Sequence, residues 1–346
     1  MTGATRRRNR ATLIGLSAVA IWSTLALFGA LAGPVPPFQL VAMAFTIVFA
    51  LTLAAWAARG EDPRTHLRQS AAVWILGIAG LFGYHLLYFI GIQNAPAADA
   101  NLINYLWPML IVLFSALLPT DAGVGRLRWF HLSGATFGLA GTALIVTDGN
   151  ALTFHTEFVI GYLAAIGAAL TWSGYSVLSR RFAHISTDAV GVFCGGTALL
   201  AWVAHLLLEP TVWPASTVAW LAVVGLGLGP VGTAFFVWDR GVKHGDLRVL
   251  GAGAYAAPLL STILLLSFDL ADASSTLVLA CLLIVGGGLL AGRELLADAT
   301  RTPTGRWRRR ACGTLPERVH RHTSGPPGRR AARHSHAPCS RRCPPR

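Results

Sequence analysis

Apolar residues gather in ten long runs, separated by short polar connections that leave no room for a soluble domain. Each run is about 18 residues or longer, enough to cross the hydrocarbon core of a bilayer as a helix. The pattern therefore predicts an all-α polytopic membrane protein with ten transmembrane helices. The expected spans are 11–31, 37–58, 72–93, 98–118, 128–147, 159–178, 187–208, 217–237, 248–268 and 275–293.

Composition agrees with this reading of the pattern. The chain is 54% hydrophobic and only 12% charged, with a mean hydropathy of +0.55, which is typical of membrane proteins rather than soluble ones. Most of the net charge of +13 comes from the last 46 residues, which hold 13 Arg and one acid. We expect residues 294–346 to be a disordered basic cytoplasmic tail that contacts anionic lipid headgroups or nothing at all.

Charged residues alternate between successive connections. Lys and Arg occur in every second connection, whereas the intervening connections contain none, and acids lie in or beside most of them. The positive-inside rule then places both termini in the cytoplasm, with residues 1–10 as a basic cytoplasmic segment and the protein in the bacterial inner (plasma) membrane. A signal peptide is an alternative for the first run, but its apolar stretch is longer than an ordinary signal core, so we expect a retained helix.

The two halves of the chain match after a shift of 150 residues. Aromatic residues, prolines and glycines recur in order without a gap: Trp22 with Trp172, Gly91 with Gly241, Tyr105 with Tyr255, and Pro108 with Pro258. Because five helices per half is an odd number, the second copy must cross the membrane in the opposite sense. We therefore expect two inverted repeats, 11–147 and 159–293, an arrangement typical of secondary transporters with a site at the repeat interface.

The fourth apolar run begins with an unusual polar stripe. Asn101, Asn104, Tyr105 and Pro108 lie at i, i+3, i+4 and i+7, so they share one helix face. Pro108 lacks an N–H and leaves the carbonyl of Asn104 without its helical partner, while Trp107 lies beside the same face. This face is predicted to line a substrate pathway. The alternative is that the amides only join helices, as polar residues in membranes often do.

Other polar and aromatic residues lie deep inside predicted spans. Tyr84 and Tyr88 are one helical turn apart with His85 beside them, and Trp22 and Trp172 occupy equivalent depths in the two halves. His85 marks either a polar interior or a packing contact. Trp238, beside Asp239, is a gate or an interfacial anchor. The Trp residues near helix ends are expected in the interfacial belt: Trp56, Trp74, Trp129, Trp213 and Trp220.

Several chemistries lack the residues they need. No Lys or Arg lies in the middle of a span, which argues against phosphorylated or nucleotide-sugar substrates, and no carboxylate lies there to couple sodium. A proton-coupling group, if there is one, would be His85. No P-loop or HExxH motif occurs, and Cys339 with Cys343 has no second ligand pair, so we expect no enzyme activity, no metal and no cofactor.

The motifs resemble a known family. The ten helices in two inverted repeats resemble the EamA-type drug/metabolite transporter superfamily. Within it, Trp22-Ser23-Thr24 and the string from Asn104 to Pro108 resemble the YddG-type aromatic amino acid exporters over about residues 11–293. The resemblance implies a basket-shaped bundle whose central cavity exports Phe, Tyr and Trp. Matching positions give its cavity residues as Trp22, Tyr84, His85, Tyr88, Tyr105, Trp107 and Trp172; Asn101 and Asn104 are added from helical spacing.

Three alternatives stay open from the sequence. The chain could export apolar cations or drugs, because an aromatic cage also suits cations. It could instead be a membrane-embedded enzyme or a scaffold, which the inverted repeat disfavours. We expect alternating access without coupling to an ion gradient, because no carboxylate lies in the middle of a span. Proton antiport is the alternative. The sequence leaves the oligomeric state open. The predicted partners are a small-molecule substrate and the lipid bilayer, not nucleic acid.

Overall fold

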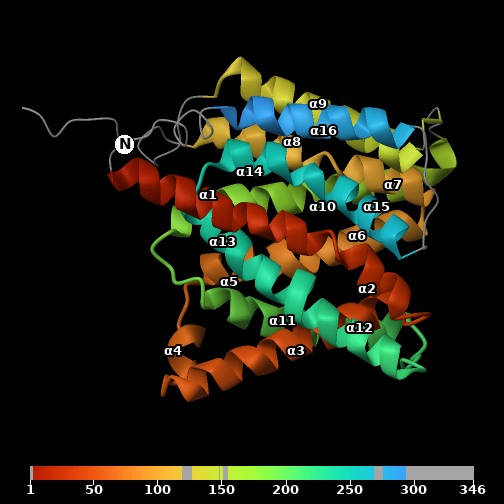
Figure 1. Ribbon diagram of the computed structural model, residues 1–346. Coiled ribbons are helices and arrows are strands. Elements are labelled where there is room, and N and C mark those ends of the chain that lie inside the picture. The colour runs from red at the N-terminus through yellow and green to blue at the C-terminus, as the bar shows by residue number, and fades with distance from the viewer. Residues whose placement is uncertain (1–2, 119–126, 148, 151–154, 269–275, 294–346) are drawn as a thin grey trace, which may run out of the picture. The chain divides into compact units, whose positions relative to one another are not determined.

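The computed structural model describes residues 3–118, 127–147, 149–150, 155–268 and 276–293, all of which belong to one compact unit, residues 1–302. These residues form helices without strands (Figure 1). The first half contains α1 (Gly3–Trp22), α2 (Leu25–Leu31), α3 (Pro37–Ala58), α4 (Pro63–Leu67), α5 (Ala71–Ile78), α6 (Tyr84–Gln93), α7 (Ala97–Asn104), α8 (Trp107–Phe114) and α9 (Trp129–Thr147). The second half contains α10 (Val159–Leu178), α11 (Ala189–Leu208), α12 (Thr217–Leu228), α13 (Ala234–His244), α14 (Leu247–Ala254), α15 (Ala256–Ser267) and α16 (Thr276–Ala291).

The helices follow the predicted apolar runs. Within the described residues, 9 helical stretches are long and apolar enough to cross a membrane, and each coincides with a predicted run. The tenth run corresponds to α16, which is shorter, so the count of ten stays a prediction. The first span begins earlier than expected, at Gly3, because Arg is a good helix former and continues the helix into the basic segment. The predicted tail, 294–346, lies outside the described residues.

Several spans are interrupted at equivalent points of the two halves. One turn of π-helix, Ala79–Gly83, separates α5 from α6, and another, Gly229–Thr233, separates α12 from α13, 150 residues later. The fourth run is interrupted between Asn104 and Trp107, as the missing N–H of Pro108 predicts, and α14 gives way to α15 at Tyr255. Such interruptions free backbone carbonyls, and π turns are frequent at functional sites.

Helix pairing also exchanges under the 150-residue shift. α1 packs on α13 and α10 packs on α6, so the first span of each half contacts the third span of the other. Two further extensive contacts join helices that the shift relates to each other, α3 with α11 and α9 with α16. The inverted repeat remains a prediction, which these exchanged pairs and paired interruptions support.

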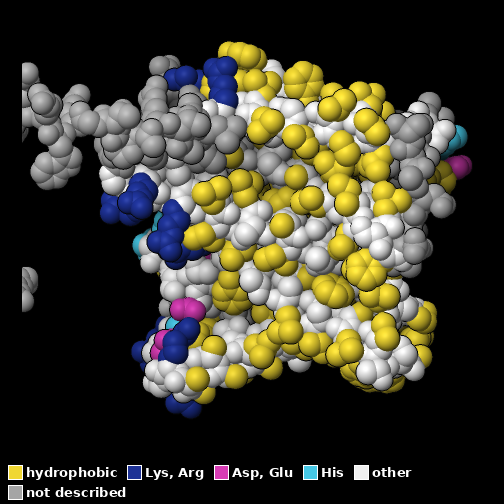
Figure 2. Space-filling view, in the orientation of Figure 1, with side chains coloured by type: hydrophobic (Ala, Val, Ile, Leu, Met, Phe, Trp, Pro, Cys, Tyr) yellow, Lys and Arg dark blue, Asp and Glu magenta, His cyan; other side chains and the backbone are white. Residues whose placement is uncertain are grey.

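Charge divides the ends of the bundle. Figure 2 shows Lys and Arg gathered at the end that carries the N-terminus, and apolar side chains along the sides of the helices. We call this end the basic end. Exposed Leu, Ile and Val on the helix flanks, such as Leu163, Leu206 and Leu282, suit contact with lipid. Lys243, which the expected spans leave in a connection, and Arg248, at the start of the next expected span, are both buried within α13 and α14.

Glycine allows α9 and α16 to meet backbone to backbone. A Cβ on Gly134 would lie 2.5 Å from the carbonyl oxygen of Gly287, and one on Gly287 would lie 2.6 Å from the carbonyl oxygen of Gly134. In lipid, close approach of this kind supplies packing that the hydrophobic effect cannot. The neighbouring Gly286 and Gly288 would meet nothing within 4 Å, so only part of this glycine-rich run packs helices.

We expect Gly134→Ala to destabilise the protein by about 1–3 kcal/mol, because the added methyl group forces α9 and α16 apart. Gly286→Ala is the matched control and should be neutral or slightly stabilising, since it adds no contact and reduces backbone entropy. Thermal unfolding in detergent would compare the two. Equal melting temperatures for both variants would contradict the proposed contact.

Candidate substrate cavity

A cavity of about 740 Å³ lies among α1, α2, α3, α6, α7, α8, α10, α13 and α15. This volume is within the range of about 300–1,000 Å³ typical of small-molecule sites. All nine residues predicted to bind substrate line it: Trp22, Tyr84, His85, Tyr88, Asn101, Asn104, Tyr105, Trp107 and Trp172. The structure thus brings the predicted residues together, while their contact with substrate stays a prediction.

The cavity reaches toward one end of the bundle. Its lining includes Gly29, Pro37, Ala97 and Val146, which border the connections that contain no Lys or Arg. At the basic end, by contrast, helices are tied together. The Arg180 guanidinium donates hydrogen bonds to the carbonyl oxygens of Val242 (3.1 Å) and Gly245 (2.7 Å), which joins the end of α10 to the turn between α13 and α14.

Four indole rings meet at the inner side of the cavity, three of them in its lining and Trp238 behind them. Trp22, Trp107, Trp172 and Trp238 come from α1, α8, α10 and α13, and their ring centroids are 5.0–6.4 Å apart in every pairing. We call these four residues the tryptophan cluster. Edge-to-face and offset contacts at such distances are favourable between aromatic rings. Trp238 is fully buried and donates a hydrogen bond from Nε1 to Ser176 Oγ (3.1 Å), so it is part of this cluster rather than an interfacial anchor.

Phenols and amides form the polar wall. The Tyr88 hydroxyl donates to Asn101 Oδ1 (2.8 Å), and Asn104 Nδ2 donates to the Tyr84 hydroxyl (3.3 Å). Tyr84 and Tyr88 stack with their ring centroids 6.0 Å apart, and Tyr84 also contacts Trp172. The polar stripe predicted on the fourth run therefore faces the phenols predicted on the third.

Asn104 carries an unsatisfied polar atom. Its Oδ1 is buried and has no hydrogen-bond partner among the described residues. Turning the amide over would pair the oxygen with the Tyr84 hydroxyl and leave the NH₂ unpaired instead, so half of the group lacks a protein partner in either orientation. A buried polar atom without a partner costs about 1–3 kcal/mol, and such a group in a native protein often marks a ligand contact.

The two π turns supply carbonyl oxygens to cavity side chains. Trp22 donates from Nε1 to the carbonyl of Pro230 (3.0 Å), and His85 donates from Nδ1 to the carbonyl of Leu81 (2.7 Å). Because a carbonyl only accepts, the His85 bond places the ring proton on Nδ1 and leaves Nε2 as an acceptor in the neutral ring. The irregular backbone thus fixes the orientation of two cavity residues.

Polarity is unequal between the two halves. The first half contributes the phenols, amides and imidazole, whereas the polar side chains that the second half adds to the lining are Ser261 and Thr262. Among the described residues, none of those that line the cavity is Asp, Glu, Lys or Arg. The cavity therefore suits a ligand that is apolar over most of its surface and carries no net charge.

Sequence reasoning missed Phe235 as a cavity residue and misplaced Trp56. Phe235 lines the cavity and contacts Trp22, Trp172 and His85, but it stands in an apolar run with nothing to distinguish it from a lipid-facing residue. Trp56 is buried, not in an interfacial belt, since its ring stacks on His66 at 4.1 Å.

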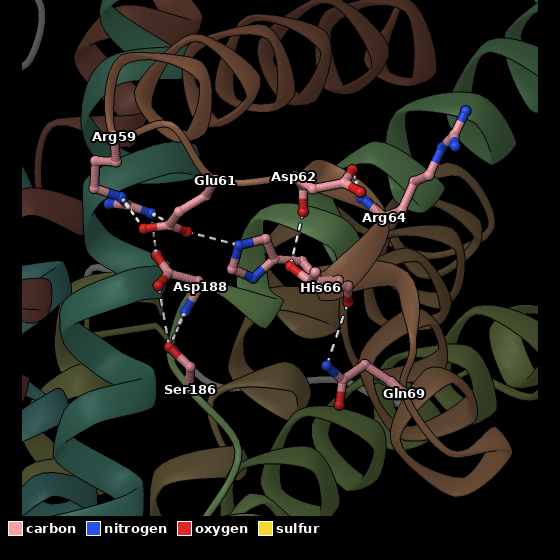
Figure 3. Close-up of polar contacts among 9 residues, drawn as sticks. Arg59, Glu61, Asp62, Arg64, His66, Gln69, Ser186 and Asp188 are labelled. Carbon is pink, nitrogen blue, oxygen red and sulfur yellow. Dashed lines mark hydrogen bonds and ion pairs between the residues drawn. The ribbon is translucent and has the colours of Figure 1, made fainter.

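An exposed group of charged residues joins two connections at the basic end (Figure 3). The Arg59 guanidinium bonds both Glu61 (2.6 Å) and Asp188 (3.3 Å), and His66 Nε2 lies 2.8 Å from Glu61. Glu61, His66 and Asp188 could together ligate a metal ion by geometry, but the Arg59 guanidinium already pairs with both carboxylates. The hydrogen bond from Arg59 lowers the pKa of Glu61 below its ordinary value.

Comparison with known proteins gives a consistent result. Residues 9–147 match the EamA-like transporter family. A protein of Ancylobacter novellus named aromatic amino acid exporter YddG is 52% identical over 285 residues, covering 82% of this chain and 97% of the relative. The Escherichia coli K12 protein of the same name is 25% identical over 304 residues, with the same shares covered. A crystal structure at 51% identity superposes with a TM-score of 0.77, covering 84% of this chain and 99% of that one.

Proposed function

Because the chain belongs to the EamA-like transporter family, and within it to the YddG-type proteins, we propose that it exports aromatic amino acids from the cytoplasm by alternating access. It is a multi-pass membrane transporter of a small molecule, and the alternating charge of its connections supports cytoplasmic termini and an inner-membrane location. The tail after residue 293 has no part in this proposal.

The single observation that carries the proposal is the composition of the cavity. An aromatic ring of the substrate packs against the tryptophan cluster, and each ring contact adds about 0.5–1.5 kcal/mol beyond the burial of apolar area. The α-ammonium or α-carboxylate of the same substrate pairs with the unsatisfied half of the Asn104 amide and with the neighbouring phenols. Both features are needed to separate Phe from aliphatic amino acids and from plain aromatic hydrocarbons.

The arrangement corresponds to a carrier open to the outside. The large cavity reaches the end whose connections contain no Lys or Arg. Two hydrogen bonds close the basic end: one from Arg180 to the carbonyl of Gly245, and one from the backbone N–H of Asp246 to Thr12 Oγ1 (2.8 Å). If the α1–α13 and α6–α10 contacts exchanged their geometries, the end that the large cavity reaches would close and the basic end would open. None of the described residues that line the cavity has a carboxylate, which supports facilitative export and gives an apolar cation no counter-charge from these residues.

We expect Trp172→Leu to reduce the preference for Phe over Leu by about threefold to tenfold, because one ring contact with the substrate is lost. Trp220→Leu is the matched control, since Trp220 is 43% exposed on α12 and lies outside the cavity. Efflux of both amino acids from preloaded proteoliposomes would measure the ratio. An unchanged ratio in Trp172→Leu, with folded protein, would refute the proposed ring contact.

A further inference from the structure

A second, very small cavity lies at the basic end, on the other side of the tryptophan cluster. It measures about 10 Å³ and is lined by Val73, Leu76, Tyr175, Ser179, Phe182, Ile185, Phe193, Asp239 and Lys243. Tyr175 contacts Trp172 of the cluster, and Asp239 follows Trp238 directly in the chain. The cluster therefore stands between the large cavity and this small one.

The small cavity corresponds to the large one under the 150-residue shift between the two halves. A shift of 150 residues relates five of its lining residues to residues that line the large cavity, namely Leu76 to Leu226, Tyr175 to Leu25, Ser179 to Gly29, Ile185 to Val35 and Asp239 to Phe89. If the two halves exchange conformations during transport, this small cavity expands into the vestibule that receives substrate from the cytoplasm. Its residues are then the first that a substrate meets.

The two counterparts differ in charge, which only the small cavity carries among the described lining residues. Where the large cavity has Phe89, the small one has Asp239, whose carboxylate pairs with Lys243 Nζ at 2.9 Å one helical turn along α13. Both side chains are nearly inaccessible, at 4% exposed for Lys243 and 2% for Asp239. Removing two charges from water is costly, and an apolar pair of similar volume would often be at least as stable. Stability alone is therefore a weak reason for an ion pair here.

The pair also contacts the connection between α10 and α11. Thr187 donates from Oγ1 to Asp239 Oδ2 (2.8 Å), and Lys243 donates from Nζ to the carbonyl of Ile185 (3.1 Å). Both partners belong to the connection between α10 and α11. If that connection moves away, each charged group loses a hydrogen-bond partner. The Asp239 carboxylate can then accept a hydrogen bond from a substrate, and the Lys243 ammonium can donate one.

We propose that Asp239 and Lys243 form a loading site for zwitterionic amino acids at the cytoplasmic entrance. The α-ammonium of the substrate takes the place of Lys243 at the carboxylate, and its α-carboxylate takes the place of Asp239 at the ammonium. One ion pair is exchanged for two, so the net charge does not change. When the substrate moves on to the large cavity, the protein pair re-forms and closes the entrance. This inference rests on the proposed export of amino acids.

The test separates the charges of the substrate. In everted membrane vesicles, entry of labelled Phe is measured in competition with phenylethylamine, which lacks the carboxylate, and with 3-phenylpropanoate, which lacks the ammonium. Lys243→Met should make phenylethylamine at least tenfold more effective relative to Phe, and Asp239→Asn should do the same for 3-phenylpropanoate. A purely structural pair would not reverse the charge preference in this way.

Either single variant leaves a buried charge without its partner and could fail to fold. The double variant Asp239→Asn/Lys243→Met removes both charges and should fold, but should raise the half-saturating Phe concentration at least tenfold. Arg59→Gln/Glu61→Gln is the matched control, because it removes one charge of each sign from the exposed group in Figure 3.

The outcomes distinguish the two proposals. A folded double variant with the half-saturating concentration of the wild type would overturn the loading site and leave the export function standing. Absence of Phe entry in wild-type vesicles would overturn the export function, and the loading site with it. An equal effect of the Arg59 control would attribute the change to surface charge and also overturn the loading site.

Discussion

Asn104→Ala is expected to lower Phe export by about 10-fold to 100-fold, because a hydrogen bond to a charged group contributes about 1.5–3 kcal/mol. Asn104 lines the cavity, and half of its amide has no partner among the described residues. Removing the amide should also relieve the cost of that unsatisfied atom, so the protein should lose transport without losing stability. Initial rates of efflux and thermal unfolding of the same preparation would separate the two effects.

Asn94→Ala is the control for this prediction. Asn94 is an exposed amide at the end of α6 that donates to the carbonyl of Ile90, so its removal should leave transport unchanged. If Asn104→Ala exported Phe at the wild-type rate, the polar stripe would serve helix packing, the alternative that the sequence left open. A parallel loss of stability and transport in Asn104→Ala would point the same way.

Arg248→Met is expected to destabilise the protein by about 3–5 kcal/mol, the cost of leaving a buried charge without its partner. Arg248 is 2% exposed and bonds the Asp246 carboxylate twice, through Nε (2.9 Å) and Nη2 (2.6 Å). The same carboxylate accepts the Arg248 backbone N–H at the start of α14. The exposed Arg64 provides the control, and Arg64→Met should change the melting temperature little.

The double variant Asp246→Asn/Arg248→Met should recover most of this loss, because neither residue of the pair then remains as a buried charge without its partner. It should also respond differently to acid. Burial alone would raise the pKa of Asp246, but the bonds and charge of Arg248 outweigh burial and hold the pKa below its ordinary value. A lowered pKa in the folded state gives stability that is present above the ordinary pKa and lost as the pH falls through the folded one. The double variant should lack this loss, and an identical acid response in wild type and double variant would contradict it.

Several residues of the candidate cavity could be predicted from the sequence because they are polar side chains within apolar spans. Asn101, Asn104 and Tyr105 share a helix face that lipid would not tolerate, and the structure places all three in the lining. Pro108, the fourth member of the predicted stripe, does not line the cavity, since the helix is interrupted before it and Trp107 takes its place. The spacing of a regular helix does not predict which residues share a face beyond such an interruption.

The sequence by itself determined the apolar spans, the alternation of charge between connections and the polar stripe, because each depends on neighbours along one helix and on the solvent around it. Only the tertiary structure decided that indoles from four helices meet, that Phe235 joins them, and that Asp239 and Lys243 are buried together beneath them. The physical reason is that hydrophobicity reports whether a side chain avoids water but not whether it faces lipid, another helix or a cavity. That choice is made when the two halves pack, and it places the paired charges behind the aromatic cluster.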